Sequence, residues 1–163
     1  MRATVWENDP AVVSRAMQKL SCEAGNTQIA RVLRLALAEK EPVSGLVYVG
    51  DHCEDDAGEL RELAASLGAR PVSVFVFHEC ADDDRRSLKA KPIFKRMAEA
   101  SGGVYVEFKP DSGAVLRELL GNVGALAAAG PEGVKQVEPA TTAEARELRS
   151  KLMLPAPKPG GEA

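Results

Sequence analysis

Three β-rich runs, separated by stretches with helical periodicity, constrain the fold of this chain most strongly. The runs lie at 46–49, 72–77 and 104–108. The first is continuously apolar, which is typical of a strand covered on both faces. Amphipathic helical patterns lie between them, and a parallel neighbour is reached only through such a crossover. The sequence therefore predicts an α/β fold with a parallel sheet of about three strands flanked by helices.

The boundaries of the crossover helices are marked by local signals. One helix is predicted at about 55–67, ending at Gly68, because glycine commonly follows a helix C-terminus. The next carries Pro92 in its first turn, where the missing N–H costs little, and ends at Gly102-Gly103. These lengths agree with two βαβ units.

Two more helices are predicted before the first strand. The first begins at Pro10, and Thr27 is expected to cap the second, which closes before Pro42. No strand precedes them except a possible remnant at 3–6. This inventory is typical of the later half of a doubly wound, Rossmann-like domain.

The character of the chain changes in its last part. A final helix opens at Asp111 or Ser112, and the sequence then becomes rich in proline, glycine and charge. We therefore predict a domain over 1–130 and a tail over 131–163. A short helix at 142–153 is expected inside this tail, because a Thr-x-x-Glu capping pattern precedes it.

Composition narrows the functional class. With 163 residues, 45% hydrophobic and 28% charged, the chain is expected to form one soluble domain. The net charge of −3 provides no positive field for nucleic acid or an anionic membrane, so neither is expected as a partner. No apolar segment approaches the roughly 18 residues of a membrane span. The 3 cysteines show no disulfide spacing, which predicts a cytoplasmic location.

Carboxylates gather after the first two strands. Asp51 directly follows the first strand, with further acids up to Asp56, and 82–84 follow the second strand. Ligands of open parallel sheets bind beyond the carboxyl ends of the strands, and Mg²⁺ prefers oxygen ligands. Asp51 is the best single candidate. The alternative interpretation is that these acids cap helices or lie in a solvated loop.

Several stretches together resemble a known family. They are "CEAGNTQIARVLRLAL", "GLVYVGDHCEDD", "PVSVFVFHE" and "IFKRMAEASGGVYVEF". In this order they resemble the later part of a von Willebrand factor A-like (VWA) domain of the bacterial intracellular type, from about Cys22 to Ala129. The resemblance implies a metal-ion-dependent adhesion site, in which Thr27 matches the Thr of one loop and Asp51 matches the Asp after the fourth strand. Both would be ligands of Mg²⁺.

The chain also departs from the family pattern. It contains no Asp-x-Ser-x-Ser run, and the family's first strands have no counterpart before Ala3. We therefore expect an incomplete Mg²⁺ site and a domain incomplete at its N-terminus, either truncated or completed by another chain. The strand at 46–49 would then have an open edge, which favours pairing with another chain or self-association.

Two other chemistries compete with this interpretation. His52 and Cys53 follow one strand while His78 and Cys80 follow the next, so four zinc-capable side chains are available, although without the usual ligand spacing. Alternatively, Asp51 would act as nucleophile or metal ligand in a small Mg²⁺-dependent phosphoryl-transfer or phosphoacceptor domain. Such domains also use a late lysine, for which no convincing position is evident.

The interpretation favoured by the sequence is a non-enzymatic, VWA-like module that binds a protein partner through the loops after its strands. An acidic side chain of that partner would complete the shell of any bound Mg²⁺, as the resemblance implies. No G-x-S-x-G elbow, G-x-G-x-x-G loop or P-loop lysine is present to suggest catalysis. Trp6, the only tryptophan, is expected to anchor packing.

Overall fold

A computed structural model describes residues 6–19, 26–81, 83–110 and 112–153. The fold is α/β, with an open sheet of 3 strands in the order β1-β2-β3. Both strand pairs are parallel. The strands are β1 (Gly45–Gly50), β2 (Ser73–Glu79) and β3 (Tyr105–Phe108). The predicted class, a Rossmann-like parallel sheet flanked by helices, is confirmed.

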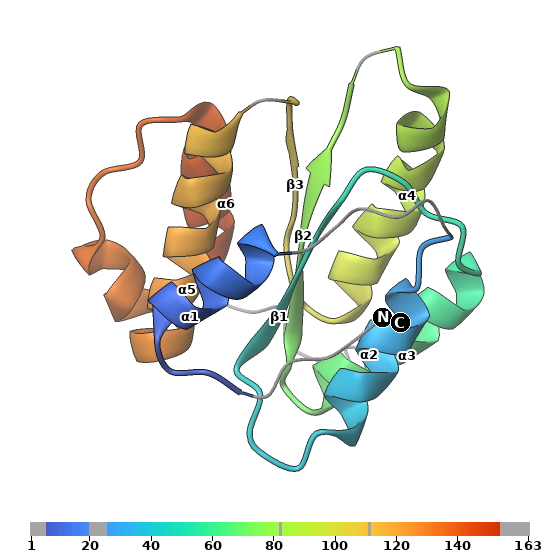
Figure 1. The fold of residues 1–163 in the computed structure, drawn as a ribbon, viewed down its shortest axis with the longest axis horizontal. Helices are drawn as coiled ribbons and strands as arrows, with labels where there is room; N and C mark the ends of the chain where they lie inside the picture. The colour runs from blue at the N-terminus through green and yellow to red at the C-terminus, as the bar shows by residue number, and fades with distance from the viewer. Residues whose placement is uncertain (1–5, 20–25, 82, 111, 154–163) are drawn as a thin grey trace, which may run out of the picture.

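Helices cover both faces of this sheet. They are α1 (Pro10–Gln18), α2 (Ile29–Ala38), α3 (Ala57–Ala69), α4 (Arg85–Ala100), α5 (Gly113–Gln136) and α6 (Ala143–Leu152). In Figure 1, α2, α3 and α4 lie on one side of the strands, and α1, α5 and α6 lie on the other. None of the helices in the described ranges is both long and apolar enough to cross a membrane.

The central strand β2 explains the two-layered core. Its residues from Val74 to His78 are all buried, because helices lie on both faces. Val74 and Val76 pack with Leu33, Leu60 and Phe94 on the side of α2, α3 and α4. The alternate side chains of β2 point the other way and pack with α5 and α6. That second cluster contains Phe75, Phe77, Val106, Phe108, Leu119 and Leu148.

Two helix ends differ from the predictions. Helix α4 begins at Arg85, so Pro92 lies inside it and not in the first turn. The earlier start is stabilised by Asp84, whose carboxylate accepts hydrogen bonds from the first-turn N–H groups of Arg86 and Ser87. Helix α3 continues through Gly68 to Ala69. A Cβ on Gly68 would lie 2.9 Å from Cα of Ser101, so this glycine allows close packing and does not end the helix.

The chain beyond residue 130 belongs to the same folded unit as far as residue 153. Helix α5 kinks at Ala129–Gly130, where Gly130 has φ of 62°, and continues to Gln136. Helix α6 lies where a short helix was predicted and buries Leu148 completely against the Phe75 and Phe77 side of the sheet. The predicted boundary at 130 and the tail are therefore corrected for residues 131–153, because α6 completes the second core. Residues 154–163 lie outside the described ranges.

The two edges of the sheet differ. At the β3 edge, Lys151 of α6 donates a hydrogen bond to the backbone carbonyl of Tyr105. At the opposite edge, β1 has β2 as its only strand neighbour in the described residues, as the sequence predicted. The predicted strand remnant at 3–6 falls mostly outside the described ranges. Trp6 is described, but it is 68% exposed and does not anchor the core.

Candidate functional site

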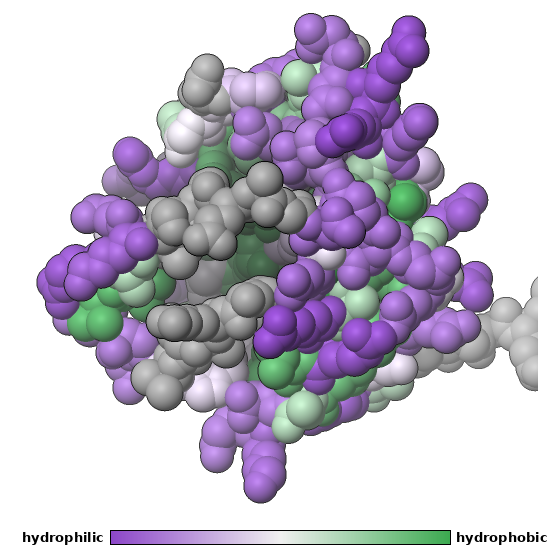
Figure 2. Space-filling view, turned by 45° about the vertical axis from the view of Figure 1, so that its right-hand side comes forward, coloured by the Kyte–Doolittle hydropathy of each residue, from purple (hydrophilic) through white to green (hydrophobic). Residues whose placement is uncertain are grey.

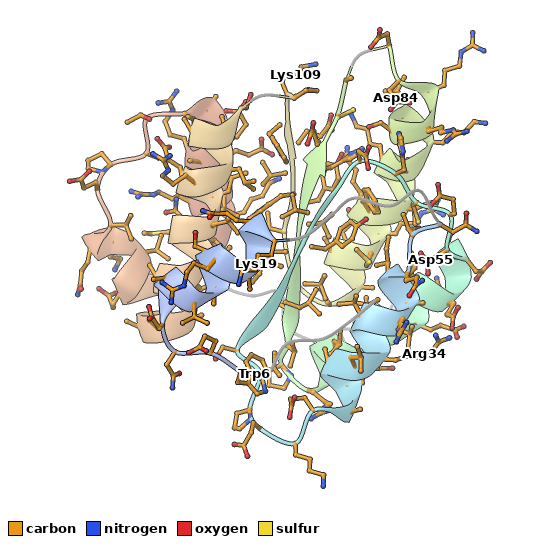
Figure 3. All side chains as sticks on the ribbon, viewed as in Figure 1. Trp6, Lys19, Arg34, Asp55, Asp84 and Lys109 are labelled. Carbon is orange, nitrogen blue, oxygen red and sulfur yellow. The ribbon has the colours of Figure 1, made fainter. Side chains whose placement is uncertain are left out.

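The loops that follow β1 and β2 form a polar rim at the carboxyl end of the sheet. Asp51 directly follows β1, and its side chain is 59% exposed. Its backbone carbonyl accepts a hydrogen bond from Nε2 of His78, which lies 3.1 Å away on β2. In Figure 3, Asp84 lies beyond the end of β2 and Lys109 lies beyond the end of β3, both on the side of the molecule opposite Trp6.

Thr27 links two loops and does not cap α2. Its Oγ1 donates to Oδ2 of Asp55 at 2.8 Å and accepts from the backbone N–H of Glu54 at 2.9 Å. The N–H of Thr27 in turn donates to the carboxylate of Glu54, which lowers the pKa of Glu54. The hydroxyl group is therefore already used as both donor and acceptor within the fold.

The cap of α2 comes from Asp55, which lies on a different loop. Its carboxylate oxygens accept from the backbone N–H groups of Ile29 and Ala30, both at 3.1 Å. The residue at the N-cap position, Gln28, makes no side-chain cap. The predicted cap by Thr27 is thus corrected, because a charged carboxylate reaches two N–H groups at the positive helix end where one hydroxyl would satisfy one.

A chain of three side chains connects the ends of β1 and β2. His52 Nε2 lies 2.6 Å from Oδ2 of Asp84, and His52 Nδ1 lies 3.5 Å from Oδ2 of Asp51. The hydrogen bond from His52 is the main cause of a lowered pKa of Asp84. Asp84 also caps α4, so it fixes the position of His52 relative to that helix.

Beside these three side chains lies a hollow of about 380 Å³. Its lining residues are Asn26, His52, Cys53, Glu54, Arg86 and Lys89. Neither Thr27 nor Asp51 is among them. The two cations come from the first turns of α4, where positive side chains are usually unfavourable because they add to the positive end of the helix dipole. Among the lining side chains, these two cations stand beside one carboxylate, that of Glu54.

The buried ring of His78 lies under the rim and is hydrogen-bonded to the elements that form it. The ring is fully buried, with Nδ1 2.7 Å from the Tyr105 hydroxyl and Nε2 2.8 Å from Oγ of Ser87. Because Nε2 also contacts the Asp51 carbonyl, which only accepts, the hydrogen bonds fit a neutral ring protonated at Nε2. Burial lowers the pKa of His78. This ring ties β2, β3, α4 and the start of the Asp51 loop together.

The four zinc-capable side chains are not brought together. His52 contacts Asp84, whereas His78 is engaged with Ser87 and Tyr105. Cys53 is half-buried, and burial raises the pKa of its thiol. Within the part of the chain that the structure describes, no group of three or more His, Cys, Asp or Glu side chains is arranged to hold a metal ion.

Sequence reasoning did not identify Arg86 and Lys89 as members of the site. The available signal was the run "RRSLK", which follows Asp84 directly. A basic run in the first turn of a helix, behind an N-cap aspartate, departs from the usual preference for acidic residues there. It was missed because the helix was expected to begin near Pro92, which left the run in a loop.

Comparisons with known proteins identify no family for this fold and site. No protein-family model matches the chain, and searches of curated proteins and of solved structures return no significant match.

Proposed function

We propose that this protein is a VWA-like interaction module that binds an acidic segment of a protein partner at the rim beyond β1 and β2. The observation that carries the proposal is the hollow lined by His52, Arg86 and Lys89. Of the acidic side chains at the rim, Glu54 lines this hollow as well, and its carboxylate is held by the N–H of Thr27. Arg86 and Lys89 are available from one helix face for a carboxylate of the partner.

The architecture supports recognition more than catalysis. The hollow is partly open to solvent, so an extended segment of another macromolecule can reach its lining side chains. Ser87 lies within hydrogen-bond distance of His78, but Ser87 is 1% exposed and also donates to the Glu79 carbonyl. This pair therefore has no access to a substrate, and its hydrogen bonds serve the packing of α4 on β2.

The residues present do not fit a tight Mg²⁺ site formed by Thr27 and Asp51. The hydroxyl of Thr27 is used by Asp55 and Glu54, while the Asp51 carboxylate lies near His52. A cation would have to displace at least one of these interactions and keep most of its water ligands. Arg86 and Lys89 therefore attract the acidic partner in this proposal, and no bound Mg²⁺ is needed for the contact.

The test is an NMR titration of the full chain with a hexaglutamate peptide. We expect backbone signals of Asn26, 52–54 and 86–89 to shift, and raised salt to weaken the effect because the contacts are ionic. Replacing Arg86 and Lys89 together by alanine is expected to weaken binding about tenfold, since two ion pairs of about 0.7 kcal/mol each amount to one factor of ten.

Arg96→Ala provides the matched control, because Arg96 is an exposed cation on the same helix outside the hollow. Equal weakening by this control, or shifts confined to another surface, would contradict the proposal. A repeat with added Mg²⁺ separates the two recognition modes. Binding that appears only with Mg²⁺ and is lost in Asp51→Ala would support a metal-dependent adhesion site instead.

A phosphoacceptor role for Asp51 is the second candidate, favoured by one observation. Lys109 directly follows β3 (Figure 3), and the exposed Asp51 directly follows β1, so both lie at the carboxyl end of the same parallel sheet. Incubation with acetyl phosphate and Mg²⁺, followed by intact-mass analysis, tests this role. A mass increase of one phosphoryl group that is absent in Asp51→Asn would support it, and an unchanged mass would refute it.

A further inference from the structure

Exposed apolar side chains concentrate around the free edge of β1. Eight large apolar side chains are exposed in the described residues, and five of them lie on β1 or line the hollow beside it. These five, here called the edge cluster, are Trp6, Val13, Leu35, Val47 and Val49. Figure 2 shows hydrophobic side chains inside a hollow on a face that is otherwise largely hydrophilic. Such a concentration on a soluble domain marks an interaction surface.

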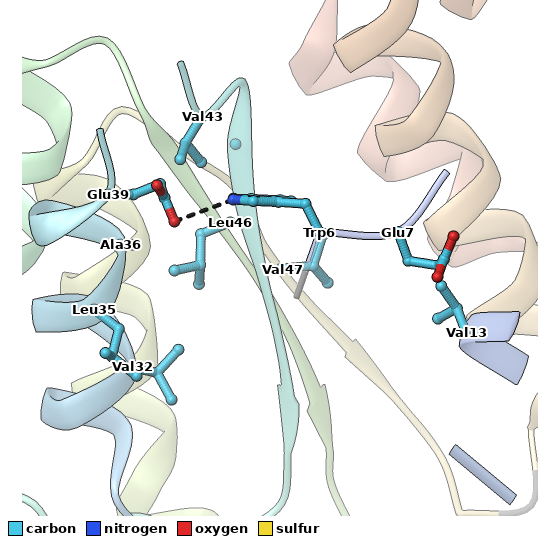
Figure 4. A pocket seen from close by; sticks show the side chains of 11 residues that line it. Trp6, Glu7, Val13, Val32, Leu35, Ala36, Glu39, Val43, Leu46 and Val47 are labelled. Atoms are coloured by element: carbon cyan, nitrogen blue, oxygen red, sulfur yellow. Dashed lines mark hydrogen bonds between the residues drawn. The ribbon is translucent and has the colours of Figure 1, made fainter. Parts of the chain in front are cut away.

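The hollow beside β1 is bounded by two helices. It has a volume of about 670 Å³ and is lined by Val13 of α1, by Val32, Leu35 and Ala36 of α2, and by the first residues of β1. Trp6 lies over it, and its indole Nε1 donates to Glu39 at 3.1 Å (Figure 4). The edge strand therefore lies between α1 and α2, with apolar side chains on both walls.

The backbone of β1 offers unused hydrogen-bonding groups at this edge. The N–H of Val76 donates to the carbonyl of Val104, directly before β3, so the odd-numbered residues of β2 turn their backbone groups towards β1. Phe75 and Phe77 are the register partners of Val47 and Val49. In a parallel pair, the residues flanking a register partner make the ladder bonds. The N–H and C=O groups of Val47 and Val49 therefore point away from the sheet.

Nothing in β1 protects this edge from pairing. Its sequence, GLVYVG, contains neither a charged residue nor a proline. Edge strands of monomeric proteins usually carry such features or a bulge, because an open apolar edge pairs with other strands. The exposed edge of β1 is therefore able to pair with another strand.

The charge pattern indicates what pairs with it. Arg31 and Leu35 of α2, and Glu39 directly after its last turn, lie at intervals of four, with Leu35 exposed in the middle. The Glu39 carboxylate also accepts from Trp6 within the same copy. A two-fold axis through the edge of a sheet reverses the direction of both the strand and the helix beside it. Two copies of α2 would then meet at Leu35, with Arg31 of each copy facing Glu39 of the other. This stripe is complementary to itself.

We infer that β1 pairs antiparallel with β1 of a second copy of this chain, and that the two sheets join into one. Pairing centred on Tyr48 places Val47 of each copy opposite Val49 of the other, so both outward-facing residues find the same kind of partner. The edge cluster and the two α2 stripes are buried at the same time. This inference does not depend on the rim, which lies at the carboxyl end of the strands.

The first measurement is the mass of the full chain by analytical ultracentrifugation over a range of concentrations. We expect a reversible dimer that Val49→Lys weakens at least about tenfold, because the substitution buries a charge at the new strand pair. Leu88→Lys is the matched control, since Leu88 is 44% exposed on α4 outside the edge cluster. It should leave the dimer unchanged, as should the double alanine variant at Arg86 and Lys89.

The second measurement identifies the interface without relying on a strand variant. Glu39→Arg should weaken the dimer, and adding Arg31→Glu should restore it, because the swapped charges again face each other. Hydrogen exchange at the amides of Val47 and Val49 should slow as protein concentration rises. A monomer at every concentration with fast exchange at these amides overturns the inference. So does a dimer that is insensitive to Val49→Lys and to the charge swap, or a monomer whose edge is filled by a different extended peptide.

Discussion

Replacing Asp55 by alanine should destabilise this protein more than any other substitution in the acidic stretch after β1. One carboxylate satisfies three donors, namely the N–H groups of Ile29 and Ala30 and the hydroxyl of Thr27. It thereby attaches the first turn of α2 to the loop that precedes α3. The alanine variant leaves two backbone N–H groups at a helix end without a protein partner.

The expected loss of unfolding free energy is about 3 kcal/mol. A lost helix cap costs about 1 kcal/mol, and hydrogen bonds to a charged group contribute roughly 1.5–3 kcal/mol each when buried. Asp55 is half-buried, and water partly replaces the lost bonds, so the sum is well below the maximum. Asp56→Ala is the matched control, because Asp56 caps α3 through one hydrogen bond to the N–H of Glu59 at 2.8 Å. It should cost about 1 kcal/mol.

Urea unfolding followed by circular dichroism measures both variants, provided that the slope of the transition is unchanged. Hydrogen exchange gives the local test, because the amides of Ile29 and Ala30 should lose protection in Asp55→Ala and keep it in Asp56→Ala. Equal losses of stability in the two variants would refute the argument that Asp55 joins α2 to its loop. Full protection of both amides in Asp55→Ala would refute it as well.

Three further predictions concern the core. Leu148→Ala should lower the free energy of unfolding in urea by about 3 kcal/mol, because it leaves a cavity at a fully buried site. Its control, Glu147→Ala, removes an exposed side chain and should change the free energy of unfolding by less than about 0.5 kcal/mol. Equal effects of the two substitutions would mean that α6 is not part of the core. Ser101→Ala should cost about 2 kcal/mol, because its buried hydroxyl accepts from the N–H of Val74 at 2.9 Å; a neutral result in the same assay would show that this bond is dispensable. Burial lowers the pKa of His78 in the folded state below the ordinary value of 6.5, so the unfolded chain binds a proton more readily than the folded chain. The stability of the protein should therefore fall as the pH drops below 6.5. A urea midpoint that stays constant between about pH 7.5 and 5.5 would contradict this prediction.

The rim shows how far local signals carry a site prediction. The position of the rim followed from the sheet alone, because the carboxyl ends of parallel strands share one side. The interpretation of the acids as caps proved right for Asp56, which caps α3, whereas Asp84, expected in a solvated loop, caps α4. Only the structure shows that Asp55 caps α2, whose first residue, Ile29, lies 26 residues earlier in the chain. A contact between distant segments leaves no local pattern in one sequence.

Hydrophobic periodicity and crossover length by themselves determined the α/β class and the parallel sheet. These features depend on which residues must be buried along each element, and that pattern is local. The tertiary structure decided the rest: α6 completes the second core, Thr27 binds a loop and not a helix end, and Arg86 and Lys89 gather at the rim. Each depends on pairing between segments far apart in the chain, where burial and hydrogen bonding are settled only once the layers have packed.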